Sequence, residues 1–166
     1  MQTLRRYAVF LIVPVIYLID WWTKSLIVEQ VPYGHGTEIT GFLNIVHARN
    51  FGGVFGFLAN YPQAKMIFSL LPLLVVAVLI FVLFRYNFPF SKRLALSSIL
   101  GGAMGNIHDR LFYGYVTDFL DFHAAGYHWY AFNVADIAVS FGVGLWVYAE
   151  LFLSGKSTGT EECSSG

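Results

Sequence analysis

The stretch Leu70-Leu-Pro-Leu-Leu-Val-Val-Ala-Val-Leu-Ile-Phe-Val-Leu83 decides the fold class, because it contains no charged side chain and no polar one. Largely apolar sequence extends around it from about Ala64 to Phe84, and a bilayer core takes roughly 20 such residues as one helix. Pro72 is acceptable there, since neighbouring groups satisfy the freed backbone atoms in membrane helices. The sequence therefore predicts a helix that crosses a membrane.

The composition of the whole chain agrees with this prediction. Apolar residues make up 57% of the chain and charged residues only 12%, about half the share of charge in an average globular protein. A soluble protein of this size could not cover its surface with so few charges. The formal net charge is zero, so no basic field predicts a nucleic-acid partner.

The length of 166 residues suits one domain. We place a single membrane-embedded domain at residues 1–153. The remaining residues, 154–166, are rich in Gly, Ser, Thr and Glu and are predicted to form a disordered tail. Cys163 in this tail is the only cysteine, so an intrachain disulfide is excluded.

Three other stretches are apolar and long enough to span a bilayer, which gives four predicted transmembrane helices in total. Basic residues cluster before the first span, between the second and third, and after the fourth. By the positive-inside rule these segments lie in the cytoplasm, together with both termini. The sequence therefore predicts an all-α membrane protein. The other three spans are Tyr7–Ser25, Leu94–Phe112 and Phe132–Leu153; the basic residues are Arg5, Arg6, Arg85, Lys92, Arg93 and Lys156.

Two loops, residues 26–63 and 113–131, are then expected to face outward. Within the first loop, the segment Phe42 to Phe57 combines β-forming residues with three glycines and predicts a small extracytoplasmic β-ribbon. Within the helices, the spacings of Gly101 with Gly105 and of Ser140 with Gly144 favour close helix packing.

Polar side chains gather at one depth, near the outer ends of three predicted helices and in the loop after the third. Ionisable groups in membrane spans are costly and generally face the bundle interior at functional sites. Simple helix-holding pairs are an alternative: Asp20 with Lys24, and Asp109 or Asp136 with Arg110. The outer carboxylates outnumber the available bases, however, which favours a functional site. The carboxylates are Asp20, Asp109, Asp118, Asp121 and Asp136, and the bases are Lys24 and Arg110, with Arg49 possible from the loop.

In chain order these residues form five motifs that resemble the successive motifs of the lipoprotein signal peptidase (signal peptidase II) family. Each motif alone is weak, but five in the right order are highly specific. Two positions differ from the expected pattern, Trp21 and Gly53, and neither is catalytic. The motifs are Asp20-Trp-Trp-Thr-Lys24, Asn50-Phe-Gly-Gly-Val-Phe-Gly56, Gly101-Gly-Ala-Met-Gly-Asn106-Ile-His-Asp109-Arg110, Val116-Thr-Asp118-Phe119 and Phe132-Asn-Val-Ala-Asp136.

The resemblance implies an aspartic endopeptidase of the bacterial cytoplasmic (inner) membrane, with its active site on the extracytoplasmic side. Its substrate would be a prolipoprotein, cut just before a cysteine that carries a diacylglyceryl group. The implied partners are this substrate, membrane lipids and globomycin-type inhibitors; the implied state is a monomer without cofactor or metal. The implied catalytic pair is Asp118 and Asp136, and the implied binding or supporting residues are Asp20, Lys24, Asn50, Gly52, Asn106, Arg110 and Asn133.

Two neighbouring carboxyls suit amide hydrolysis chemically. One ionised carboxylate can activate a water molecule while its protonated partner donates a hydrogen bond to the scissile carbonyl. Close like charges in apolar surroundings cannot both ionise easily, so one pKa of the pair rises. The residues alone do not decide which aspartate is the base.

Other functions remain open at the level of sequence. Asp118, Asp121, His123 and His128 offer oxygen and nitrogen ligands for a metal, although no His-Glu-x-x-His motif or cysteine pair supports it. Ser25 beside Lys24 is the only outer candidate for a Ser/Lys protease and fits a helix end better. A proton-coupled transporter would need polar residues in the inner halves of the spans, which carry almost none. A non-enzymatic assembly subunit is the remaining alternative.

Overall fold

The computed structural model describes residues 9–52 and 64–153, without the side chains of residues 64–69. Several sequence predictions fall outside this part of the chain. They are the disordered tail at 154–166, the first two residues of the first predicted span, the departure at Gly53 and the last part of the predicted ribbon, 53–57.

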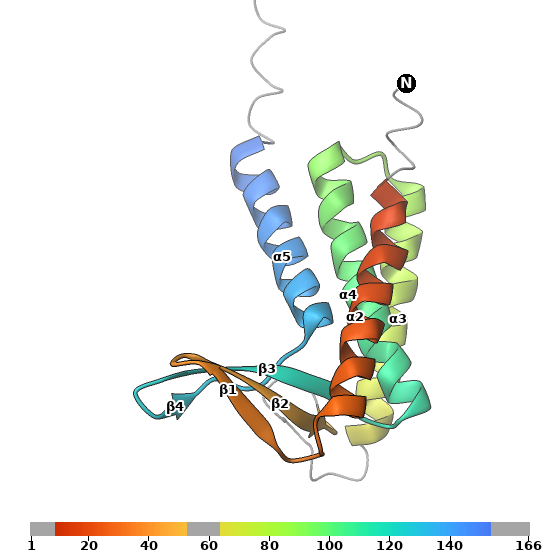
Figure 1. Ribbon diagram of the computed structural model, residues 1–166. Helices are drawn as coiled ribbons and strands as arrows, with labels where there is room; N and C mark the ends of the chain where they lie inside the picture. Colours follow the sequence, from red (N-terminus) through yellow and green to blue (C-terminus); the bar gives the residue numbers. More distant parts are fainter. Residues whose placement is uncertain (1–8, 53–63, 154–166) are drawn as a thin grey trace, which may run out of the picture.

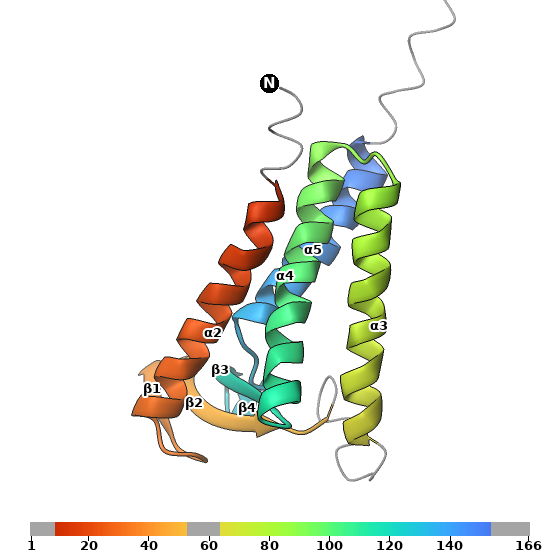
Figure 2. The same ribbon diagram turned by 90° about the vertical axis from the view of Figure 1, so that its right-hand side faces the viewer.

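Four long helices form a bundle, and a small sheet lies at one end of it (Figure 1). Helix α4 packs against the other three helices and is therefore the centre of the bundle (Figure 2). A 3-10 turn, η1, precedes the first helix, and a π-helical segment, η3, follows the last; both lie at the end opposite the sheet. The bounds are η1 Val9–Leu11, α2 Ile12–Gln30, α3 Ala64–Arg85, α4 Phe90–Phe112, α5 Val134–Tyr148 and η3 Ala149–Leu153.

Within the described residues, two helices are long and apolar enough to cross a membrane. They are Val9–Gln30, with 22 residues, and Val134–Leu153, with 20. The described apolar part of α3, Leu70–Arg85, is shorter. Helix α4 is long enough but not apolar enough to count among them, because its second half carries two glycines in a row and the polar run around Asn106. Among the residues that the structure describes, two helices rather than the four predicted therefore have the composition of a membrane span.

The prediction of an all-α protein is wrong. Besides the helices, the described residues contain four strands, which form an antiparallel sheet in the order β1-β2-β3-β4. The ribbon predicted in the first loop accounts for only part of this sheet, because β3 and β4 come from the second loop. The strands are β1 Gly36–Thr40, β2 Leu43–Asn50, β3 Val116–Ala124 and β4 Tyr127–His128.

Strand β3 forms because its residues favour strands and because β2 offers it a long partner. Its β-branched and aromatic residues have high strand propensity, and Phe122 stacks on Phe42 and on Phe132, with ring centroids 6.1 and 5.6 Å apart. The chain reverses into β4 at Ala125 and Gly126, whose φ angles of 51° and 81° suit a tight hairpin turn. The pairing joins residues about 70 positions apart, which no local pattern could indicate.

Glycines let α4 approach its neighbours closely. A Cβ at Gly101 would lie 3.1 Å from the Val13 carbonyl oxygen in α2, and one at Gly105 would collide with the Asp20 carboxylate. The predicted close packing at these two positions is confirmed. On α5 the prediction is wrong: Gly144 has nothing within 4 Å, and Gly142 makes the close approach, to the Ala95 carbonyl oxygen.

Candidate active site

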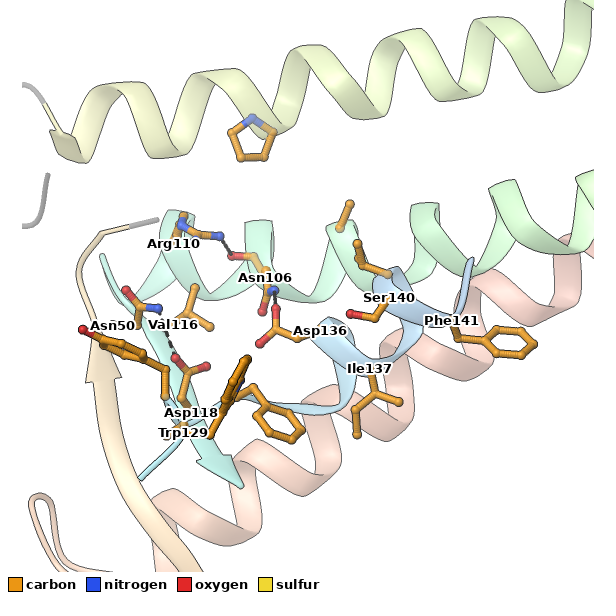
Figure 3. A pocket seen from close by; sticks show the side chains of 16 residues that line it. Asn50, Asn106, Arg110, Val116, Asp118, Trp129, Asp136, Ile137, Ser140 and Phe141 are labelled. Atoms are coloured by element: carbon orange, nitrogen blue, oxygen red, sulfur yellow. Dashed lines mark hydrogen bonds between the residues drawn. The ribbon is translucent and has the colours of Figure 1, made fainter. Parts of the chain in front are cut away.

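Asp118 extends from β3 toward the junction of the sheet with α4 and α5 (Figure 3). It is buried, and each carboxylate oxygen accepts a hydrogen bond from an asparagine side chain. The Asn50 amide at the end of β2 donates to Oδ2 at 3.1 Å, and the Asn133 amide donates to Oδ1 at 2.7 Å. Two amide donors from different segments therefore fix the orientation of this carboxyl group.

Asp136 lies in the first turn of α5 and helps to start that helix. The Asn133 side chain caps the helix by accepting the Asp136 backbone N–H at 3.0 Å, and the Asp136 carboxylate accepts the Asn133 backbone N–H at 3.2 Å. This reciprocal arrangement is a capping box. The second carboxylate oxygen accepts a hydrogen bond from the Asn106 amide of α4 at 2.8 Å.

Asn133 connects the two aspartates directly. Its amide nitrogen donates to Asp118, and its side-chain oxygen accepts from the Asp136 backbone, while the side chain is fully buried. The same nitrogen lies 3.2 Å from Asn106 Oδ1, so the two asparagines also contact each other. One buried residue thus positions both carboxyl groups relative to each other.

A buried lysine supports this arrangement from α2. The Lys24 ammonium group lies 2.7 Å from Asp20 Oδ2, 3.2 Å from Asp109 Oδ2 and 3.0 Å from Asn106 Oδ1. The ammonium group thus makes two ion pairs and one hydrogen bond within the protein. Lys24 therefore belongs to an ion network and is not free to act as a base.

Both acids of the network also hold backbone amides beside the candidate catalytic residues. Asp20 accepts the Ala135 N–H at 2.8 Å, and Asp109 accepts the Thr117 N–H at 3.0 Å. Ala135 precedes Asp136, and Thr117 precedes Asp118. The sequence places Asp109 among the outer carboxylates and as a possible partner of Arg110, but does not predict it as a site residue. Its position three residues after Asn106, on the same face of the helix, was the signal that could have placed it here.

Arg110 and Gly52 form the rim of the site. The Arg110 guanidinium donates to the Asn106 carbonyl oxygen at 3.4 Å and to the Gly52 carbonyl oxygen at 3.3 Å. The Gly52 N–H in turn donates to Asn50 Oδ1 at 3.0 Å. All nine predicted site residues therefore belong to one connected hydrogen-bond and ion-pair network.

The two aspartates line one cavity of about 990 Å³. One end of this cavity is polar, and the other extends between α3, α4 and α5 along apolar side chains (Figure 3). A ligand in it could therefore place a polar group at the carboxyls and an apolar part among the helices. The polar end is lined by Asn50, Asn106, Arg110, Asp118 and Asp136; apolar lining residues include Pro72, Ala103, Ile137, Val139 and Phe141.

Burial raises the pKa of the Asp118 carboxyl from 3.8 to about 7, and the negative charge of Asp136 contributes in the same direction. The hydrogen bonds from Asn50 and Asn133 oppose the shift, because they stabilise the ionised form. Asp118 consequently keeps its proton up to about neutral pH. A protonated carboxyl beside a second carboxylate is the pairing that acid–base hydrolysis requires.

The alternative metal set is not assembled around Asp118. Asp118 and Asp121 are three residues apart on β3, so their side chains point to opposite faces of the strand. Asp121 instead accepts hydrogen bonds from Asn44 and from the His128 ring, each at 2.8 Å. Among residues 9–52 and 64–153 no group of three His, Cys, Asp or Glu side chains is arranged to hold a metal ion.

The alternative Ser/Lys pair is not formed either. The Ser25 hydroxyl donates to the Trp21 carbonyl oxygen within its own helix, at 2.8 Å, while Lys24 is bound in the ion network. The Ser25 hydroxyl and the Lys24 ammonium group are thus bound to other partners and do not form a nucleophile–base pair.

Comparison with known proteins agrees with this geometry. A family model described as signal peptidase (SPase) II matches residues 12–152. The chain belongs to the signal peptidase II family. Its membership makes it a peptidase, and the match contains all of the network described above.

Individual members of the signal peptidase II family are similar over most of their length. The lipoprotein signal peptidase of Cupriavidus taiwanensis is 42% identical, over 82% of this chain and 78% of its own length. That of Francisella tularensis subsp. novicida is 38% identical, over 89% of this chain and 94% of its own. A solved bacterial membrane enzyme superposes with a TM-score of 0.79 at 30% identity, over 91% of this chain and 92% of its own. Together with the two apolar helices, this similarity identifies a membrane protein.

Proposed function

We propose that this peptidase removes the signal peptide from diacylglyceryl-modified prolipoproteins, by cutting just before the lipidated cysteine with a water molecule held between Asp118 and Asp136. The observation that carries the proposal is the link through Asn133, which holds both carboxyls at the polar end of one cavity. The names of the relatives support the substrate class.

In this mechanism the pair begins with one proton, on Asp118, whose raised pKa favours it. Asp136 takes a proton from the water as the water oxygen attacks the scissile carbonyl carbon, and the Asp118 hydroxyl transfers its proton to the carbonyl oxygen, which gives a gem-diol. As the C–N bond breaks, a gem-diol hydroxyl returns a proton to Asp118 and the leaving nitrogen takes the proton from Asp136. The new carboxyl group then loses its proton to solvent. The products are a signal peptide with a free carboxylate and a lipoprotein that begins with the modified cysteine.

The apolar part of the cavity suits the lipid of the substrate. Burying one CH₂ group contributes about 0.8 kcal/mol, so two acyl chains could bind strongly without polar contacts. We place the protein in the bacterial cytoplasmic membrane as a multi-pass monomer, with the catalytic pair toward the extracytoplasmic side. The basic residues Arg85, Lys92 and Arg93 at the opposite end of the bundle support this orientation. Globomycin-type inhibitors are expected to occupy the same cavity.

The test is cleavage of a purified diacylglyceryl-modified prolipoprotein by the full chain and its variants. Asp118→Asn and Asp136→Asn should each lower kcat by at least about 10³-fold, because either change removes a proton-transfer group and unbalances the pair. Asp121→Asn is the matched control, a buried aspartate on the same strand but the opposite face, and should stay within about tenfold of wild type.

Near-normal turnover of a folded Asp118→Asn or Asp136→Asn variant would refute the assignment. A substrate without the diacylglyceryl group should be cut poorly by the wild-type protein. Full activity after treatment with a chelator is expected, and its loss would instead favour a metal mechanism.

A further inference from the structure

Arg49 on β2 lies on the face of the sheet opposite the catalytic cavity. Its neighbour Asn50 reaches Asp118, and successive strand residues point to opposite faces. The Arg49 guanidinium carbon lies 4.4 Å from the ring centroid of Tyr33 and 4.6 Å from that of Tyr115. These are cation–π distances, so two aromatic rings hold the charged group.

The guanidinium of Arg49 has no anionic partner in the part of the chain that the structure describes. No hydrogen bond or ion pair to it occurs there, and its Nε atom is buried without an acceptor. A guanidinium carries five N–H donors, and leaving them unmet beside apolar rings is unfavourable. Because the side chain is only partly buried, an acceptor can reach it from outside the protein.

Tyr33 is fixed in position by the turn that joins α2 to β1. The His47 ring contacts the Val31 carbonyl oxygen at 2.7 Å. The His47 carbonyl oxygen accepts the Gly34 N–H, and the His47 N–H donates to the His35 carbonyl oxygen. Gly34 has a φ of +78°, which glycine adopts without strain. The ring over Arg49 is therefore held by the sheet and does not depend on a bound molecule.

Further aromatic rings continue this surface toward the end of α4. Tyr115 lies 5.6 Å from Phe51 and 6.2 Å from Tyr113, between ring centroids. Tyr33, Phe51 and Tyr113 are each more than half exposed. We call Tyr33, Phe51, Tyr113 and Tyr115 the aromatic belt. Tyr33 lies between the end of the apolar helix α2 and the start of β1, and Phe51 directly follows β2, so the belt lies at the junction of helix and sheet. Such belts mark the headgroup level of a membrane.

We propose that Arg49 and the aromatic belt bind the phosphate of an anionic membrane phospholipid. The planar guanidinium fork matches two phosphate oxygens, and the exposed rings suit the glycerol backbone and the first part of the acyl chains. The position at the membrane boundary favours a lipid over a soluble phosphate. A lipid bound here would hold the sheet against the membrane surface, on the side away from the catalytic pair.

The experiment measures the melting temperature of the detergent-purified full chain during titration with phosphatidylglycerol or phosphatidylcholine. Wild type should bind phosphatidylglycerol more tightly, and Arg49→Gln should weaken that binding by about tenfold or more, the loss expected for one charge-assisted pair. Arg85→Gln is the matched control: Arg85 also stacks on a tyrosine, at 5.6 Å from the Tyr86 ring centroid, but at the opposite end of the bundle. This control should keep the preference.

Three results would overturn the proposal. One is an Arg49→Gln variant that keeps its preference for phosphatidylglycerol. Another is an equal loss in Arg85→Gln, which would assign the preference to net charge. A third is equal stabilisation by soluble glycerol phosphate, which would indicate a soluble ligand.

If Arg49→Gln does not fold, Arg49→Lys and Tyr33→Leu provide the same test. The first keeps the charge but lacks the planar fork, and the second keeps the arginine but removes one ring. Both should fall between wild type and full loss, and unchanged binding in both would refute the site.

Discussion

Two lysine–carboxylate pairs lie at opposite ends of the bundle and differ in how far their side chains are exposed to solvent. Lys24 and Asp20 are 2.7 Å apart, with side chains 4% and 1% exposed. Lys92 and Glu150 are 2.5 Å apart, with side chains 15% and 56% exposed. The first pair belongs to the network behind the catalytic cavity, whereas the second lies between the start of α4 and η3. Of these two pairs, only the one that contacts the candidate site is desolvated.

The difference shows what a buried ion pair contributes here. Replacing such a pair with apolar side chains often leaves stability unchanged or improved, so stability alone rarely explains it. In this protein both acids around Lys24 also accept a backbone N–H beside a candidate catalytic residue, at Ala135 and Thr117. The lysine therefore couples the two segments that carry Asp136 and Asp118. The following predictions test this contrast between the two ends.

The largest effect is expected from Lys24→Met. The change leaves Asp20 and Asp109 buried without their cation, and breaking one side of a buried pair costs about 3–5 kcal/mol. Unfolding of the detergent-solubilised variant by heat or denaturant measures this loss. A Lys24→Met variant that unfolds like wild type would show that the buried ion pair contributes no more to stability than the exposed one.

A smaller effect on stability, but a clear one on activity, is expected from Asn106→Ala. The change removes the amide that donates to Asp136 and accepts from Lys24, so kcat should fall by about 10- to 100-fold, since one such bond contributes roughly 1.5–3 kcal/mol. Asn87→Ala is the control at the other end, where Asn87 accepts a hydrogen bond from Arg93 at 2.8 Å. Equal losses of kcat in both variants would argue against a positioning role for Asn106.

The pH dependence should follow the raised pKa of Asp118. Above about pH 7 this carboxyl loses its proton, so kcat/KM should fall about tenfold for each further pH unit. The free energy of unfolding should also fall as pH rises. The folded state binds this proton more tightly than the unfolded chain, in which the pKa is 3.8. The contribution of Asp118 to stability is therefore present below about pH 4 and is lost as pH rises to about 7. Activity that is constant from pH 6 to 9 would exclude this assignment.

The smallest effect is expected from Lys92→Met. An exposed ion pair contributes at most about 1 kcal/mol, and the change lies far from the cavity. Both the unfolding midpoint and kcat should remain close to wild type. A loss comparable to that of Lys24→Met would show that the exposure of the two pairs does not determine their contributions.

The helices could be predicted from the sequence because their signal is local. Each predicted span overlaps an observed helix, and Pro72 lies inside α3 as expected. The sheet could not be predicted in full, since β3 is defined by a partner strand far away in the chain. Its first residues, Val116-Thr-Asp118-Phe119, were assigned to a loop because their role in the family motif did not indicate their backbone conformation.

The members of the site could be predicted, but their contacts could not. Asp20, Lys24, Asn106 and Asn133 were grouped by depth and by family resemblance, and all of them join the network. Asp109 is not among the predicted site residues. It contacts Lys24 of a distant helix and the backbone N–H of Thr117, and a partner in the backbone cannot be recognised from the pattern of side chains. The assignment of the site residues to catalytic and supporting roles stays a prediction, which the experiments above test.

The capping box at the start of α5 joins chemistry to folding in a single side chain. Asp136 closes the first turn of the helix that carries the chain back across the bundle, so a variant such as Asp136→Ala would disturb both helix initiation and proton transfer. A replacement that keeps the capping box must still accept a hydrogen bond from the Asn133 backbone N–H. Under the proposed function, two separate requirements therefore limit the residues that this position can accept: the reaction and the start of α5.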